Sequence, residues 1–385
     1  MIKFAVRRNL IYPLQLLLWN FLRDTESSLI SHFFEVEGFL IYTHLMFSGE
    51  FLAGLTIYFY QKQFLIKNKS IEPNKLKKLE YIYSERSYTK NLDMKAIFVI
   101  ITSAFSDFAQ FTVTLQFPKF MTMSRSLEQR LRGNFTINNA LFYSYVIKLP
   151  LFKHQKFSLI IIGIFYVIII ITEFIFQEFN IFLSYGQFII VLLYMFFIQF
   201  GNAMIESIEK YLYEYYQLDP FFVLMSQVFT GFIFCFISSF IYSPFADIAK
   251  FRQKRSTSEF VILIFAFLLF LILSGGKNSF RVLTTKIYSP MTTTFMDYIL
   301  NPFYLIYYYI SGSDFISYGK KNVAYFVINL IISVIMSFCG GVYNEFLILF
   351  CCGLERDTHS QVTRRSDVEN ELNVFYADED HDSDG

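Results

Sequence analysis

Long apolar stretches, separated by short polar connectors, dominate the chain. Residues 156–171 read KFSLIIIGIFYVIIII and residues 259–274 read EFVILIFAFLLFLILS, so neither stretch has a polar face that water could solvate. About 20 apolar residues in a helix cross the hydrocarbon core of a bilayer. The pattern therefore predicts an all-α, polytopic membrane helix bundle. Nine segments are predicted to span the membrane: residues 37–61, 95–116, 123–147, 156–177, 184–211, 219–242, 258–286, 290–310 and 322–350.

Residues 1–36 precede the first clear span. Lys3, Arg7 and Arg8 come before an apolar run at 10–22, an order typical of a secretory signal. No small-residue cleavage site follows, and Pro13 interrupts the run. We interpret the segment as an interfacial helix or as a degenerate first span, which would be the tenth.

The distribution of charge predicts the orientation. Residues 62–95 carry nine Lys/Arg against four Asp/Glu, which indicates a cytosolic loop because short cytosolic loops are enriched in Lys and Arg. The C-terminal segment 351–385 is predicted to be a disordered acidic tail on the same side, since it is too polar to bury a core. The basic loop 243–257 conflicts with this orientation. Nine spans would place the N-terminus outside, and ten would place both ends in the cytosol.

Composition narrows the possible classes of protein. Of 385 residues, 54% are hydrophobic and 17% are charged, against about 25% charged in average soluble domains. The net charge of +1 gives no indication of nucleic-acid binding. The four cysteines form no CxxC pair, and no nucleotide-binding loop or zinc-protease motif is present. We expect no cofactor and no enzymatic activity.

Carboxylates lie near the middle of two predicted spans. Glu50 follows Gly49 and precedes Gly54 by four residues, and Asp107 lies in SAFSDFAQF. A charge that faces lipid is costly, so each side chain should face a cavity or a partner helix. A substrate or gating site and a structural hydrogen bond both remain open for each.

Basic residues lie in two other predicted spans. Arg132 precedes Gly133, and Asn138 follows close to the same helix face. Lys277 and Arg281 are four residues apart and follow Gly275-Gly276, which could loosen the helix as in the discontinuous helices of transporters. Such cations could bind a phosphate or carboxylate, or they could be anchors that snorkel to the membrane surface.

Other in-span polar residues have predicted roles at the helix ends. Glu206, Glu209 and Lys210 lie near a cytosolic end, where they are interpreted as an anchor or a gate. Glu345 lies deep in the last predicted span and is a candidate partner for one of the cations. Pro302 could kink the span at 290–310.

Several segments also resemble one known family. The resemblance lies in MFSGEFLAGL (46–55), SRSLEQRLRG (124–133), KLPLFKHQ (148–155), EKYL (209–212) followed by Pro220, and KNSFRV (277–282) followed by YSPM (288–291). In this order and spacing they are similar to the nucleotide-sugar-transporter-like solute carriers of the drug/metabolite transporter superfamily. The similarity covers residues 37–350.

The resemblance implies an architecture and a function. It implies ten spans in two inverted halves, here about 37–177 and 184–350 with a degenerate first span, and alternating access about a central cavity. The expected function is secondary transport or exchange of a small, anionic metabolite, with a nucleotide sugar as one option and thiamine-like or purine metabolites as others. Candidate substrate-binding or gating residues are Glu50, Asp107, Arg132, Asn138, Lys277 and Arg281.

Two other classes of function stay open. One is a structural membrane protein that keeps the fold without transport, and the other is a membrane-embedded acyltransferase-like enzyme that would use His154. The expected partners are a small-molecule substrate and the lipid bilayer, with a homodimer as an option and no nucleic acid. The expected location is an endomembrane (Golgi, endoplasmic reticulum or vacuole) rather than the plasma membrane.

Overall fold

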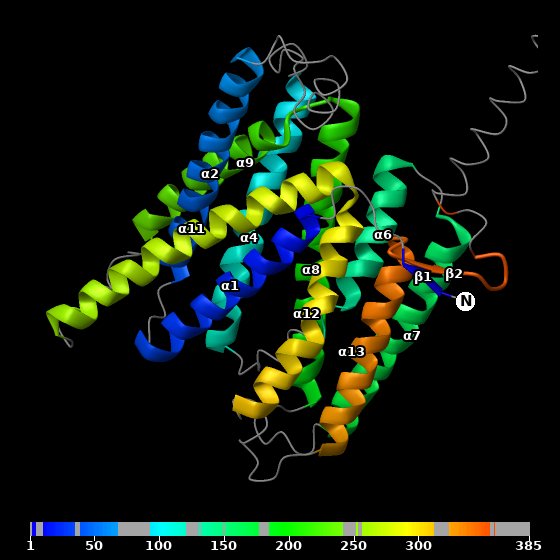
Figure 1. Ribbon diagram of the computed structural model, residues 1–385. Coiled ribbons are helices and arrows are strands. Elements are labelled where there is room, and N and C mark those ends of the chain that lie inside the picture. Colours follow the sequence, from blue (N-terminus) through cyan, green and yellow to red (C-terminus); the bar gives the residue numbers. More distant parts are fainter. Residues whose placement is uncertain are drawn as a thin grey trace, which may run out of the picture.

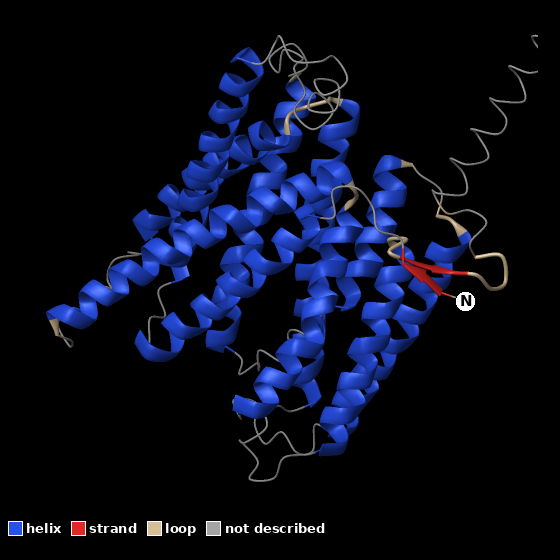
Figure 2. Cartoon of the chain, viewed as in Figure 1, coloured by secondary structure: helices blue, strands red, loops and turns tan. Residues whose placement is uncertain are grey.

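Helices form the framework of the protein (Figures 1 and 2). The computed structural model describes residues 2–4, 11–34, 39–67, 93–120, 131, 133–148, 151–176, 185–241, 252, 256–311, 323–354 and 358. The helices in this part of the chain are α1 (Ile11–Phe34), α2 (Phe39–Lys67), α4 (Met94–Phe120), α6 (Gly133–Ile147), α7 (Lys153–Phe176), α8 (Tyr185–Tyr215), α9 (Pro220–Ile241), α11 (Thr257–Ile287), α12 (Pro290–Ser311) and α13 (Val323–Tyr343).

Each of the nine predicted spans corresponds to one of the helices from α2 to α13. The bounds predicted for four spans agree with the observed helices to within three residues: 156–177, 219–242, 258–286 and 290–310. The predicted start of the span at 123–147, most of the basic loop 62–95 and most of the acidic tail 351–385 lie outside the described residues.

The protein is an all-α membrane helix bundle. Five of the described helices are both long and apolar enough to cross a bilayer: Lys153–Ile175, Gly186–Tyr215, Pro220–Phe240, Thr257–Ile287 and Val323–Tyr343. Only 28% to 44% of the apolar window of each lies buried inside the bundle. Ile160, Ile164 and Val167 of α7, for example, are more than half exposed. Lipid is the solvent that such a surface requires.

Two sequence-based expectations about helix boundaries are wrong. Pro13 does not interrupt the first apolar run, because it lies in the first turn of α1, where its missing N–H has no partner to lose. Pro302, which was expected to kink its span, lies inside α12, and the helix continues past it to Ser311. The last predicted span ends earlier than expected, because α13 stops at Tyr343 and Glu345 lies in the following turn with φ of +59°.

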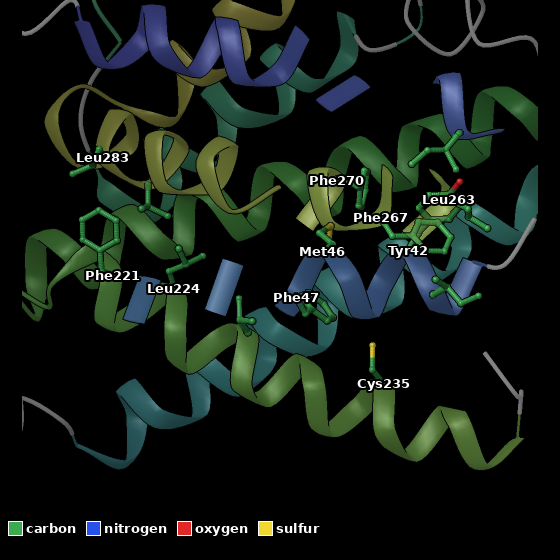
Figure 3. Packing of buried hydrophobic residues seen from close by; sticks show 14 residues of the cluster. Tyr42, Met46, Phe47, Phe221, Leu224, Cys235, Leu263, Phe267, Phe270 and Leu283 are labelled. Carbon is green, nitrogen blue, oxygen red and sulfur yellow. The ribbon is translucent and has the colours of Figure 1, made fainter. Parts of the chain in front are cut away.

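The helices pack around two apolar clusters. The larger one is built mainly by α2, α9 and α11, and Figure 3 shows its side chains between these three helices. Its labelled members are Tyr42, Met46, Phe47, Phe221, Leu224, Cys235, Leu263, Phe267, Phe270 and Leu283. The second lies among α6, α7, α8, α12 and α13. α1 packs along α11 and also contacts α12, as Figure 1 shows.

A short strand pair joins the two ends of the helical part. β1 (Ile2–Phe4) pairs antiparallel with β2 (Leu347–Leu349), which follows α13. Backbone pairing brings two strands to within about 5 Å. The residues that precede α1 therefore lie beside the residues that follow α13.

Candidate functional site

Small residues let α2 and α11 approach closely. A Cβ on Gly49 would collide with the Leu271 carbonyl, and a Cβ on Gly275 would lie 2.9 Å from the Ala53 Cβ. Gly276 lies against the ring of Trp19 on α1. The glycine pair was expected to loosen this helix. Instead, α11 continues through it, and the missing side chains give α1 and α2 room to pack.

This close approach brings Glu50 to α11. The buried carboxylate of Glu50 accepts a hydrogen bond from Asn278 Nδ2. Asn278 Oδ1 in turn accepts from Arg281 Nε at 3.0 Å. Arg281 donates two further bonds to Glu209 of α8, Nη1 to Oε2 at 2.7 Å and Nη2 to Oε1 at 2.8 Å. A continuous chain of hydrogen bonds thus crosses the bundle from α2 through α11 to α8.

Asp107 and Lys277 lie beside this chain. Asp107 of α4 interacts electrostatically with Glu50, and both carboxylates also interact with Lys277 and Arg281. Asp107 is only half-buried although it lies mid-helix, and it forms no hydrogen bond or ion pair with another described residue. An unpaired carboxylate at this depth is a candidate for contact with a ligand.

A second buried carboxylate of α8 extends the site toward α6 and α12. Glu206 Oε2 accepts from Asn139 Nδ2 and from Thr293 Oγ1, each at 2.8 Å. Glu206 also interacts electrostatically with Arg281. We call Glu50, Asp107, Glu206, Glu209, Lys277 and Arg281 the central charge cluster.

Of the six predicted site residues, the structure brings four together: Glu50, Asp107, Lys277 and Arg281. Asn138 is buried on α6 beside Asn139, and its Nδ2 has no hydrogen-bond partner in the part of the chain that the structure describes. Arg132 lies outside the described residues.

For three residues the structure adds contacts that the sequence did not indicate. Arg281 was expected to bind a phosphate or carboxylate or to anchor at the membrane surface, and its guanidinium is engaged by Glu209 in a bidentate pair. Glu206 and Glu209 were expected to be an anchor or a gate near a cytosolic end, and both are buried in the central charge cluster. Their spacing of three residues places both on one helix face, and this spacing could have indicated from the sequence that they share a site.

Glu345 also has a different partner from those expected. Its Oε1 lies 3.5 Å from His154 Nε2, and both side chains are buried. The pair joins the start of α7 to the turn after α13, away from Lys277 and Arg281. Asn278 received no role from the sequence, although it links Glu50 to Arg281.

The ends of α8 and α11 carry a second group of charges. Lys210 Nζ lies 2.8 Å from Glu214 Oε1 and donates to the Lys286 carbonyl at 2.8 Å, while Lys286 Nζ donates to the Tyr213 carbonyl at 3.1 Å. Asp219 precedes α9 and interacts electrostatically with Lys286. We call Lys210, Glu214, Asp219 and Lys286 the terminal charge cluster.

Asp219 is the N-cap of α9. Its Oδ1 accepts from the backbone N–H of Phe221 at 2.8 Å and of Phe222 at 3.2 Å, as an N-cap carboxylate should. Burial nevertheless raises the pKa of Asp219 to about 6, and the two capping bonds oppose this shift without cancelling it.

Comparisons with known proteins leave the family open. No family model matches the chain, and no curated protein matches it. Among the described residues, no group of three or more His, Cys, Asp or Glu side chains could hold a metal ion. The candidate site is therefore defined by its buried charges, at the contact of α2, α4, α8 and α11.

Proposed function

We propose that the protein is a secondary transporter of the drug/metabolite type, which moves a small metabolite by alternating access. The observation that carries this proposal is the central charge cluster, where α2 and α4 of one proposed half meet α8 and α11 of the other. Ionisable side chains are rare inside membrane bundles because they are expensive there, and they commonly mark the path of a substrate or ion.

The strand pair supports a topology of ten crossings. Ile2–Phe4 and Leu347–Leu349 can pair only if they lie on the same side of the bilayer, since its hydrocarbon core is about 30 Å thick. The chain between them must then cross an even number of times. Counting α1 as a crossing gives ten for the described helices, and its 24 residues are long enough at about 1.5 Å per residue.

The pattern of helix neighbours supports two related halves. The first would comprise α1, α2, α4, α6 and α7, and the second α8, α9, α11, α12 and α13. Taken in order, the counterparts are α1 and α8, α2 and α9, α4 and α11, α6 and α12, and α7 and α13. When each helix is exchanged for its counterpart, the contact of α1 with α11 becomes that of α8 with α4, and the contact of α2 with α11 becomes that of α9 with α4. All four contacts are observed. The contacts α2 with α9 and α7 with α13 map onto themselves. Because five is an odd number, two such halves have opposite orientations in the membrane.

A protease-protection experiment tests the topology. We expect epitope tags placed before Ile2 and after Gly385 to be digested together in right-side-out vesicles, or protected together. Digestion of one tag alone would exclude ten crossings and the strand pair with it.

Reconstitution tests transport itself. The purified protein is first screened for thermal stabilisation by a panel of metabolites, and a radiolabelled form of each stabilising compound is then used for counterflow into proteoliposomes. We expect saturable counterflow of at least one compound, and its loss in Asp107→Asn. Stabilisation without counterflow, or neither effect, would favour the structural membrane protein.

One observation supports a second candidate, the membrane-embedded enzyme. The close approach of His154 and Glu345 resembles a histidine oriented by a carboxylate, and the φ of +59° at Glu345 is unusual for a non-glycine residue. Both side chains are buried, which leaves a substrate little access. Counterflow that persists in His154→Gln would separate the two candidates.

A further inference from the structure

The central charge cluster contains more negative than positive charges. Its four carboxylates are Glu50, Asp107, Glu206 and Glu209, and its two cations are Lys277 and Arg281, so the formal sum is −2. Arg23 of α1 also acts on Glu50, but it is paired with Asp24 at 2.6 Å and adds no net charge. The terminal charge cluster, with two lysines against two carboxylates, sums to zero.

Among the described residues, the helices packed around Glu50 and Asp107 supply no cation other than Lys277, Arg281 and Arg23. Glu50 is faced by Asp107 from α4, by Lys277 and Arg281 from α11, and by Arg23 from α1. Asp107 is faced in addition by Glu209 of α8 and by the thiol of Cys235 on α9. Adding Arg132, wherever it lies, would still leave the sum negative.

The guanidinium of Arg281 is already neutralised by a buried carboxylate. Arg281 donates two N–H groups to Glu209 and one to Asn278. An anionic ligand here would either add a negative charge to a cluster that already sums to −2 or displace Glu209, and a buried carboxylate without its partner is expensive in a low-dielectric interior. Asp107, by contrast, has no hydrogen-bond partner among the described residues.

Two buried polar groups, one on α11 and one on α6, have no hydrogen-bond partner among the described residues. Ser274 precedes Asn278 by four residues and Arg281 by seven, so it lies on the same face of α11. It is fully buried, and its hydroxyl has no partner in the described part of the chain. The buried Nδ2 of Asn138 is likewise without one; the next residue in the chain, Asn139, donates to Glu206. Buried polar groups are normally satisfied, so such orphans suggest that something else completes the site.

We infer that the cargo of this transporter carries a positive charge, which Glu50 and Asp107 neutralise. This inference rests on the proposed transport function and names its substrate class: a small organic cation, such as an amine. It differs from the anionic substrate expected from the sequence, because Arg281, one of the two cations, is already paired with Glu209. Protons compensate the excess negative charge while no cargo is bound, since two uncompensated charges inside a bundle are costly.

The inference is tested on the purified full-length protein with matched panels of ligands. The cations are spermidine, choline and thiamine, and the anions are UMP, UDP-glucose and citrate. We expect at least one cation, and no anion, to raise the thermal midpoint. In weakly buffered solution the same cation should release protons, which an indicator dye detects, because it takes the place of protons on the carboxylates.

Variants assign the effect to residues. Glu50→Gln and Asp107→Asn each remove one negative charge, and we expect cation binding to weaken at least about tenfold, the factor that 1.4 kcal/mol represents. Proton release should fall in parallel. Glu173→Gln is the matched control, because Glu173 is also a buried carboxylate but lies on α7, where it accepts from Tyr325. Its affinity for cations should equal that of the wild type.

The outcomes separate this inference from the function on which it depends. Counterflow of an anion, with no cation bound, would overturn the cationic cargo and leave the transporter intact. Proton release and cation binding that survive in both Glu50→Gln and Asp107→Asn would overturn the assignment to this cluster. Absence of any bound or transported solute in either panel and in the wider metabolite screen would overturn the transporter, and the cationic cargo with it.

Discussion

The same two helices, α8 and α11, meet at two groups of charges that differ in their charge balance. At the central charge cluster Glu209 is fully buried and holds Arg281 by two hydrogen bonds, while the cluster as a whole sums to −2. At the terminal charge cluster Lys210 pairs with Glu214, whose side chain is 42% exposed, and the charges balance. Glu209 and Lys210 are adjacent in the chain and both are buried, so the partners that packing supplies, rather than burial, distinguish the two clusters.

The largest effect is expected from breaking the central ion pair. Arg281→Gln leaves Glu209 buried without its partner, which should lower the unfolding free energy by about 3–5 kcal/mol. Denaturation of the detergent-solubilised protein measures this loss. The double variant Arg281→Gln/Glu209→Gln should recover much of it, because no unpaired charge remains. A double variant as unstable as the sum of both single variants would show that the pair is not coupled.

A smaller effect should follow from crowding the α2–α11 contact that positions Glu50. In Gly275→Ala the added Cβ would lie 2.5 Å from the Gly49 carbonyl oxygen and 2.9 Å from the Ala53 Cβ. Overpacking of this kind costs about 1–3 kcal/mol. Gly163→Ala on α7 is the control, since its Cβ would meet only Ile137 Cδ1 at an ordinary 3.8 Å. That change should be neutral or stabilise by up to about 1 kcal/mol. Equal thermal midpoints for the two variants would mean that the close approach is not needed.

The terminal charge cluster should make the unfolding free energy depend on pH, by an amount comparable to or smaller than the effect of crowding the α2–α11 contact. The pKa of Asp219 in the folded protein is about 6, above its ordinary value of 3.8, so the folded state binds the proton more tightly. The unfolding free energy of the wild type should therefore rise as the pH falls from about 6 to about 4, by at most 2–3 kcal/mol or so. Asp219→Asn keeps the cap and should lack this rise. Parallel pH profiles for the two proteins would contradict the assignment.

The smallest effect is expected at Lys210. Lys210 is buried, but the side chain of its partner Glu214 is 42% exposed. Water can therefore solvate the carboxylate that Lys210→Gln leaves unpaired, as in exposed pairs, which contribute about 0.2–1 kcal/mol. Lys210→Gln keeps a donor for the Lys286 carbonyl, so the loss of stability should stay below about 1 kcal/mol. A loss as large as that of Arg281→Gln would remove the distinction between the two clusters.

The sequence by itself determined the membrane class and the positions of the helices. Apolar runs such as 156–171 are local properties of the chain, and burying them in lipid requires a helix whatever the neighbours are. The same reasoning selected Glu50, Asp107, Lys277 and Arg281, which the structure brings together, because a charge in an apolar run is conspicuous without any structure.

Only the tertiary structure decided what those charges do. Arg281 meets Glu209 across 72 residues, and Asn278 meets Glu50 across 228, separations that no local pattern encodes. The role of Gly275 was also settled by its neighbour on another helix, since a glycine can loosen one helix or admit a second. The same physical reason applies in each case. A buried charge or a missing side chain costs free energy wherever it lies, and only the packed structure determines which partner offsets that cost.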